Sequence, residues 1–264
     1  MNRRMEAVES ICFLSRAESR VSLMETLLES GPLDHRTLQQ RLDYSRSTIT
    51  RSLDSLSENG WVENSDGGYQ LTPAGRAIIS EFRELLETVE TAEQLAPFLE
   101  WFPLSSCDLS LSDLRDGELT TALAGDPLAP ARKQATLLQS TTVFRGLFPS
   151  MSIESVRLVH ERRLDSGFET ESVVSSDVAE MMHHEPFAPL LSELLSSGHH
   201  TIHVAEDVPM YLGIADGTTV QIGVEDDDGI PRALLETTNE SVRTWAESMF
   251  SKYTASAVDT LTKL

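Results

Sequence analysis

The residues from Asp43 to Thr72, DYSRSTITRSLDSLSENGWVENSDGGYQLT, decide the fold of the N-terminal third of this 264-residue chain. Ile49, Leu53 and Leu56 recur at spacings of four and three, which places them on one face of a helix. Polar and basic side chains occupy the other faces of the same segment. The pattern predicts an amphipathic helix that packs on a core through one side only.

Signals for the ends of this helix, and for a hairpin after it, are also present. Ser45 stands at the N-cap position, and Gly60 stands where a helix needs a left-handed residue to end. The runs 61–63 and 69–71 are strand-like, and residues 64–68 between them tolerate the positive φ angles of a turn. The sequence predicts a helix followed by a β-hairpin.

Further helices are expected before this stretch. Apolar spacing indicates helices over 5–15 and 21–28, the second ending at Ser30-Gly31-Pro32. Asp34 then caps a short helix that contains Leu38 and Leu42. This order, with a final helix leading into a hairpin, is that of a winged helix-turn-helix.

After the hairpin, Thr72 and Pro73 start a long helix that is expected to end before Pro97. Its apolar seam suits either a link to a second domain or pairing with a second subunit. Four prolines interrupt residues 97–130, which we interpret as a connector.

The remaining residues mix helical and strand-like patterns. Helices are expected over 131–147, 177–184, 187–195 and 239–257, and strands at 156–160, 173–174, 201–204, 211–214, 219–224 and 234–235. We therefore predict an α+β protein with a mixed α/β C-terminal domain. The expected division is a winged helix-turn-helix domain with a linker helix over 1–90, a connector over 91–130, and a mixed α/β domain over 131–264.

The net charge of −21 arises with only three lysines beside eighteen arginines. A surface rich in carboxylates and poor in lysine stays hydrated in concentrated salt, so we interpret the chain as a cytoplasmic protein of an extreme halophile. An acidic protein that binds basic partners is the alternative, although the acids are scattered and form no tail. No apolar run reaches the length that spans a membrane.

Positive charge is concentrated in the helix-turn-helix window. Residues 1–90 hold ten basic and fifteen acidic side chains. Between His35 and Leu53, however, there are four arginines and only one acidic residue, Asp43. Such a patch is the electrostatic footprint of a contact with double-stranded DNA. A solvated helix face, or a module that binds protein instead of DNA, are the alternatives. Two sets of residues are expected at the DNA. Base edges are expected to contact the residues that follow the N-cap Ser45, which are Arg46, Ser47, Thr48, Thr50 and Arg51. Phosphates are expected to contact Arg41, Gly67 and Tyr69.

A dimer is expected, because salt weakens phosphate contacts and two half-sites would restore affinity. The long helix from Pro73 is the first choice for the interface, and the C-terminal domain is the second.

Metal binding is considered because six of the seven histidines lie between His160 and His203. His199, His200 and His203 have a spacing that a zinc, nickel or copper site could use. No cysteine is near, since Cys12 and Cys107 are far away in the sequence, so we favour ordinary surface or core histidines and expect no cofactor.

Enzyme motifs are missing. The sequence has no GxSxG, GxGxxG, P-loop or HExxH motif. No lysine lies between Lys133 and Lys252, so the His-x-Lys pair of phospholipase-D-type phosphodiesterases cannot occur in the strand region. We therefore predict a protein that is not an enzyme.

The N-terminal pattern, from Arg20 through Ser45-Arg46-Ser47-Thr48-Ile49 and Asn59-Gly60-Trp61-Val62 to Gly75, resembles archaeal winged-helix transcription regulators. The C-terminal half resembles the effector domain of the methanogenesis regulatory protein (FilR) family. This second resemblance rests on the segments 207–214, 228–237 and 245–253. It implies a DNA-binding transcription regulator whose C-terminal domain senses a signal, such as a small-molecule ligand, or mediates assembly. The alternative is a metal- or small-molecule-sensing module whose winged helix serves protein–protein contacts.

Overall fold

The computed structural model describes residues 3–165 and 167–261. The chain divides into two compact units, Met1–Val89 and Glu90–Leu264, and the helix α5, Pro73–Leu99, contributes residues to both. Helices and strands are both abundant, which confirms the predicted α+β class. Within the described ranges, no helix is both long enough and apolar enough to cross a membrane.

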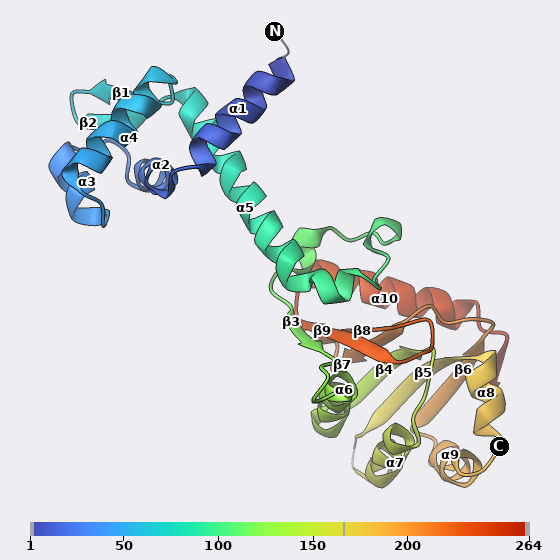
Figure 1. Ribbon diagram of the computed structural model, residues 1–264. Helices are drawn as coiled ribbons and strands as arrows, with labels where there is room; N and C mark the ends of the chain where they lie inside the picture. Colours follow the sequence, from blue (N-terminus) through green and yellow to red (C-terminus); the bar gives the residue numbers. More distant parts are fainter. Residues whose placement is uncertain (1–2, 166, 262–264) are drawn as a thin grey trace. The chain divides into compact units, whose positions relative to one another are not determined.

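The N-terminal unit contains helices followed by a hairpin, in the predicted order (Figure 1). Its elements are α1 Arg3–Ser15, α2 Glu18–Ser30, α3 His35–Arg41, α4 Arg46–Glu58, β1 Val62–Ser65, β2 Gly68–Leu71 and the first part of α5.

Both predicted ends of α4 are confirmed. The Ser45 hydroxyl accepts a hydrogen bond from the backbone N–H of Thr48 at 3.2 Å. At the other end Gly60 has a φ of +71°, and the N–H of Trp61 donates to the carbonyl of Leu56 at 3.0 Å. Ile49, Leu53 and Leu56 are fully or almost fully buried, so the apolar stripe is the core side of the helix.

The hairpin turn is tighter than the predicted loop. Ser65 pairs with Gly68, which leaves only two residues in the turn. Leu33 adds a bridge to Tyr69, with N···O distances of 2.9 and 3.0 Å. A Cβ on Gly68, whose φ is +113°, would lie 2.4 Å from the Leu33 carbonyl oxygen, so this crossing requires glycine.

The second unit is built on one eight-stranded sheet in the order β10-β6-β5-β4-β7-β8-β9-β3. The neighbours β4, β5 and β6 are parallel, and the other pairs are antiparallel. The strands are β3 Glu118–Thr121, β4 Val143–Phe148, β5 Glu169–Ser175, β6 His200–Ala205, β7 Tyr211–Ala215, β8 Thr219–Glu225, β9 Pro231–Thr237 and β10 Asp259–Leu261.

Helices cover both faces of this sheet (Figure 1). Alternate residues of each strand face opposite layers; in β7, Leu212 and Ile214 belong to one core, and Tyr211 and Ala215 to the other. The first core also contains α10 Glu240–Ala255 and the end of α5. The second contains α6 Ala129–Ser140, α7 Ile153–Arg162, α8 Ser176–Met182 and α9 Phe187–Ser196.

Several sequence expectations are wrong in this unit. The helix predicted over 131–147 is α6 followed by the strand β4, and the strand predicted at 156–160 lies inside the helix α7. The long helix α5 does not end before Pro97, because Leu95 and Phe98 are fully buried in the first core and hold its last turn. Within the predicted connector 91–130, two short 3-10 helices (Leu104–Ser106 and Leu111–Leu114) precede β3, which forms a sheet edge.

Candidate nucleic-acid interface

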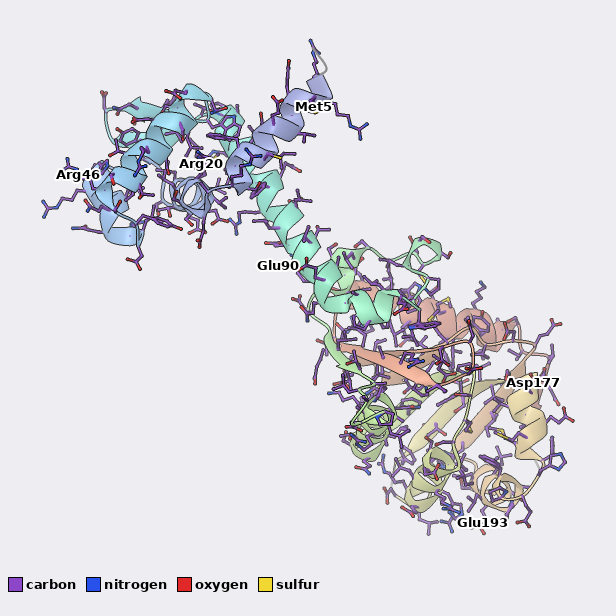
Figure 2. All side chains as sticks on the ribbon, in the orientation of Figure 1. Met5, Arg20, Arg46, Glu90, Asp177 and Glu193 are labelled. Carbon is purple, nitrogen blue, oxygen red and sulfur yellow. The ribbon has the colours of Figure 1, made fainter. Side chains whose placement is uncertain are left out.

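The outer face of α4 presents the side chains that the sequence places at DNA. Arg46, Ser47, Thr50 and Arg51 are exposed, and Thr48 is half-buried. Figure 2 shows Arg46 at the start of α4, at the edge of the N-terminal unit. The buried stripe fixes the helix from behind, so the orientation of this face follows from the core.

Hydroxyl groups hold the first turns of α4 in place. The Thr48 and Ser45 hydroxyls lie 2.8 Å apart, in addition to the capping bond. The Thr50 hydroxyl donates to the Arg46 carbonyl at 3.0 Å and lies 3.0 Å from Nε2 of His35, the first residue of α3. Ser45 therefore acts first as a helix cap, and Thr50 links the two helices.

The arginines of α4 have no acidic partner within the described ranges. Arg51 donates from Nε to the Ser47 carbonyl at 3.1 Å, and neither Arg46 nor Arg51 forms an ion pair with any described residue. Arg41, at the end of α3, donates instead to the Ser30 hydroxyl. The first turn of α4 contains no acid, and the helix dipole adds partial positive charge there. This end of α4 is suited to an anionic ligand.

The two hairpin residues expected at phosphates differ in exposure. Gly67 is exposed in the turn, but Tyr69 is half-buried and packs against the core of the N-terminal unit. Gln70 donates to Glu63 across the hairpin at 2.8 Å. Tyr69 therefore has a clear structural role whether or not it meets a phosphate.

The three histidines considered for a metal lie in different surroundings. His199 is exposed, with Nδ1 4.0 Å from Glu169. His203 lies 3.1 Å from both Glu171 and Thr260. His200 is buried. Over residues 3–165 and 167–261, no group of three or more His, Cys, Asp or Glu side chains could hold a metal ion.

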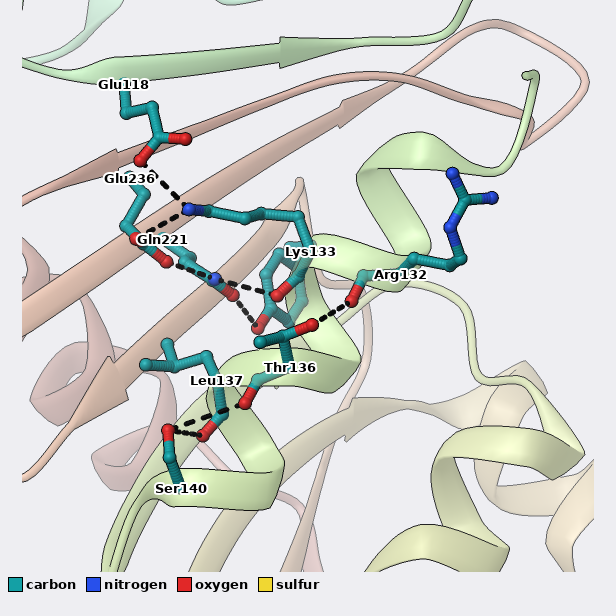
Figure 3. A network of polar contacts seen from close by, with 9 residues as sticks. Glu118, Arg132, Lys133, Thr136, Leu137, Ser140, Gln221 and Glu236 are labelled. Atoms are coloured by element: carbon teal, nitrogen blue, oxygen red, sulfur yellow. Dashed lines mark hydrogen bonds and ion pairs between the residues drawn. The ribbon is translucent and has the colours of Figure 1, made fainter. Parts of the chain in front are cut away.

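Sequence reasoning missed a polar network under α6 in the second unit (Figure 3). Lys133 forms ion pairs with Glu118 at 2.9 Å and Glu236 at 3.0 Å. Gln221 is fully buried; it donates to Glu236 at 2.7 Å and accepts from the Tyr211 hydroxyl at 3.1 Å. The hydrogen bond to Glu118 has the largest effect on the pKa of Lys133 and raises it, and the contact with Glu236 acts in the same direction. The network ties α6 to the strands β3, β7, β8 and β9, and its only sequence signal was the scarcity of lysine.

Two separate stretches of the chain match protein-family models. Residues 8–94 match the HVO_A0261 N-terminal domain, and residues 127–256 match the middle domain of the methanogenesis regulatory protein FilR1. The resemblance to archaeal regulators is thereby confirmed, and the FilR1 middle domain contains the whole sheet except β3 and β10. No curated protein matches the sequence.

Similar solved structures are more distant. The archaeal chromatin protein TrmBL2, described as showing a novel mode of DNA binding, is 14% identical; the match covers 89% of this chain and 90% of that one, with a TM-score of 0.44. Nuc of Salmonella typhimurium, a phospholipase D family member, is 9% identical over 55% of this chain and 98% of its own, with a TM-score of 0.43. Likenesses at this level carry no argument about function.

Proposed function

We propose that this protein is a sequence-specific DNA-binding transcription regulator. Its N-terminal unit acts as a winged helix-turn-helix: α4 enters the major groove, and the β1–β2 hairpin is the wing. The second unit modulates binding and is not an enzyme. The family match to a methanogenesis regulatory protein supports the regulatory role.

The observation that carries the proposal is the unpaired positive charge at the start of α4. The chain has a net charge of −21, yet Arg46 and Arg51 lie in a window that contains only one acid, and they pair with none of the described carboxylates. Arginine is the side chain that reads guanine with two hydrogen bonds, and the first residues of a recognition helix are those that reach base edges. Exposed arginines at this point are explained by a polyanion that binds there.

We further propose a homodimer in the cytoplasm of a halophilic archaeon. The acidic, lysine-poor composition supports the halophilic setting. In high salt the phosphate contacts weaken, so base contacts and a second half-site supply the specificity.

The test replaces Arg46 and Arg51 together by alanine. Each arginine that pairs with a base edge contributes about 1–3 kcal/mol, so the double variant should bind its operator at least about thirtyfold more weakly. The operator is first found by selecting bound fragments from genomic DNA, and affinity is then measured by fluorescence anisotropy at high potassium chloride.

Arg16→Ala is the matched control, because Arg16 is exposed in the same unit but lies between α1 and α2. It should leave affinity within about twofold, as expected for a surface change away from the site. Circular dichroism verifies that both variants are folded. Unchanged operator affinity in the folded double variant would overturn the assignment of α4.

A further inference from the structure

A cavity of about 50 Å³ lies inside the second unit, between strands β4, β5 and β6 and helices α6, α7 and α9. We name it the β5–β6 cavity. Its walls are mainly apolar and include Phe144, Phe148, Val156, Leu191 and Leu194. The cavity is separate from the α4 surface and has no part in the proposed contact with DNA.

One wall of the β5–β6 cavity contains a buried imidazole. His200 is only 6% exposed, and its Nδ1 lies 2.8 Å from the hydroxyl of Thr170, which also lines the cavity. The other ring nitrogen, Nε2, is buried without a hydrogen-bond partner among the described residues. An unsatisfied buried polar atom costs free energy, and such atoms are rare in folded proteins. A bound molecule would remove that cost.

The surroundings of His200 select against charge. No carboxylate, lysine or arginine belongs to the cavity lining. Burial, and secondarily the neighbouring His199, lower the pKa of His200 to about 4, so the ring is neutral near pH 7. A charged ligand would lose its hydration there without gaining an opposite charge.

The volume limits the size of the ligand. A cavity needs about 10–15 Å³ for one water molecule, so about 50 Å³ accommodates roughly three to five non-hydrogen atoms. Water is the rival occupant, but a buried water needs two to four polar partners. Besides His200, the polar side chains of the lining are Thr170, Ser155 and Ser172. The Thr170 hydroxyl lies against His200 and the Ser155 hydroxyl lies 3.0 Å from that of Ser152, so the titration below has to distinguish water from the ligand.

We propose that the β5–β6 cavity binds a small, uncharged, mainly apolar molecule whose single hydroxyl or carbonyl group forms a hydrogen bond with Nε2 of His200. Such a ligand would contact α7 and α9 on one side and the parallel strands on the other, so its binding would stabilise the packing of these helices on the sheet. That this serves to regulate DNA binding rests on the function proposed above; the binding site itself does not.

The test uses 1-butanol as the probe and the full chain without DNA. The Nε2 resonance of His200 is followed in histidine-labelled protein by long-range nitrogen–proton spectra during titration. We expect a saturable shift with 1-butanol. Butylammonium, which has the same chain but a positive charge, should saturate at least about tenfold more weakly.

Two variants locate the binding. Val156→Phe fills the cavity and should abolish the shift, whereas Val143→Phe, the same change at an exposed position outside the lining, should leave it unchanged. If Val156→Phe does not fold, Val159→Leu is used instead. It adds one methylene group to the same wall and should weaken the binding of 1-butanol at least about threefold. The wild-type protein should bind 1-butanol in preference to n-pentane, and His200→Leu should remove this preference. Binding of both molecules is measured by shifts of the Leu191 methyl groups.

The outcomes are distinct. An Nε2 resonance that does not move on addition of 1-butanol would overturn the site. A shift that persists in folded Val156→Phe would also overturn it. The same holds if His200 contacts only water when 1-butanol is present at saturating concentration. Arg46→Ala with Arg51→Ala should bind 1-butanol normally. Failure of the DNA proposal and failure of the cavity proposal can therefore be told apart.

Discussion

At the residue scale, His200 shows how a position acquires chemistry from its surroundings. The spacing of His199, His200 and His203 made it one of three metal candidates in the sequence. In the fold, β6 places its ring in the core, where it lies against Thr170 and packs edge-on with Phe168 at 5.6 Å between ring centroids. Burial of a titratable base favours its neutral form. The protein therefore carries a neutral imidazole that becomes costly to keep buried in acid.

This cost predicts a pH dependence of stability. The pKa of His200 is lowered from 6.5 to about 4, so between these values the unfolded chain binds the proton and the folded chain does not. The contribution of His200 to the free energy of unfolding should therefore fall as the pH decreases through this range, by about 3 kcal/mol in total. Below about pH 4 the loss is complete, and above pH 6.5 it is absent.

Urea titrations of wild type and His200→Leu between pH 7 and pH 4 measure this contribution. The difference between the two proteins cancels the other titrating groups, and the variant should lose less stability than wild type. His184→Gln changes an exposed histidine and should follow wild type. Parallel pH curves for wild type and His200→Leu would contradict the prediction.

At the element scale, Gly75 decides how α5 starts. The N–H of Gly75 donates to the Thr72 hydroxyl at 3.0 Å, which confirms the predicted cap. A Cβ at this position would lie 2.0 Å from the backbone carbonyl oxygen of Trp61. The helix therefore packs directly on the chain that leads into the hairpin, and a side chain would push the two apart.

We expect Gly75→Ala to lower the free energy of unfolding of the N-terminal unit by about 3 kcal/mol, the upper end for overpacking, because the opposing atom belongs to the backbone. Native-state hydrogen exchange of the α4 amides measures this change. Gly125→Ala is the control, since its added Cβ would meet nothing within 4 Å. Equal protection of α4 in wild type and Gly75→Ala would show that the start of α5 can move without cost.

Local signals explain which elements could be predicted. The helix α4 has a cap, a regular apolar face and a glycine stop within one short segment, and all three were read correctly. The helix α7 was taken for a strand because Val156, Leu158 and His160 stand at every second position, although Val159 interrupts the alternation with polar residues. In the fold, Val156 is buried and Leu158 and Val159 are half-buried, so the helical period decides. Short mixed patterns fit both structures until the partners are known.

At the scale of the whole molecule, the described residues leave an apolar surface on the N-terminal unit. Met5, Val8 and Ile11 of α1 are about half exposed, as are Leu85 and Val89 of α5. Ala7, Ile11, Leu14, Ala77 and Leu85 are among the residues that line a hollow of about 480 Å³ on this unit. Apolar surfaces of this kind mark contacts with other molecules. This is the surface on which we place the proposed dimer, and α5 was the interface expected from the sequence.

Leu85→Glu should convert the dimer to a monomer. A carboxylate placed in an apolar interface loses its hydration without gaining a partner, so the dimer dissociation constant should rise at least about a hundredfold. Sedimentation equilibrium over a range of protein concentrations measures this change. Operator affinity should fall with it.

Leu123→Glu makes the same substitution at a position that is 63% exposed in the second unit, and it should leave the oligomeric state unchanged. A wild-type protein that is monomeric at every concentration would contradict the dimer. A dimer that is unaffected by Leu85→Glu would place the interface elsewhere.

The sequence by itself determined the features that depend on neighbouring residues. These are the helices and hairpin of the N-terminal unit, the caps of α4 and α5, and the position of the arginines on the outer face of α4, because spacing and capping act within a few residues. The excess of acidic over basic residues is likewise a property of the sequence alone. Only the tertiary structure decided the order of the eight strands, the pairing of β3 with β9, and the burial of His200 against Thr170. Those depend on segments 30 to more than 100 residues apart, whose contacts form only when the chain has folded.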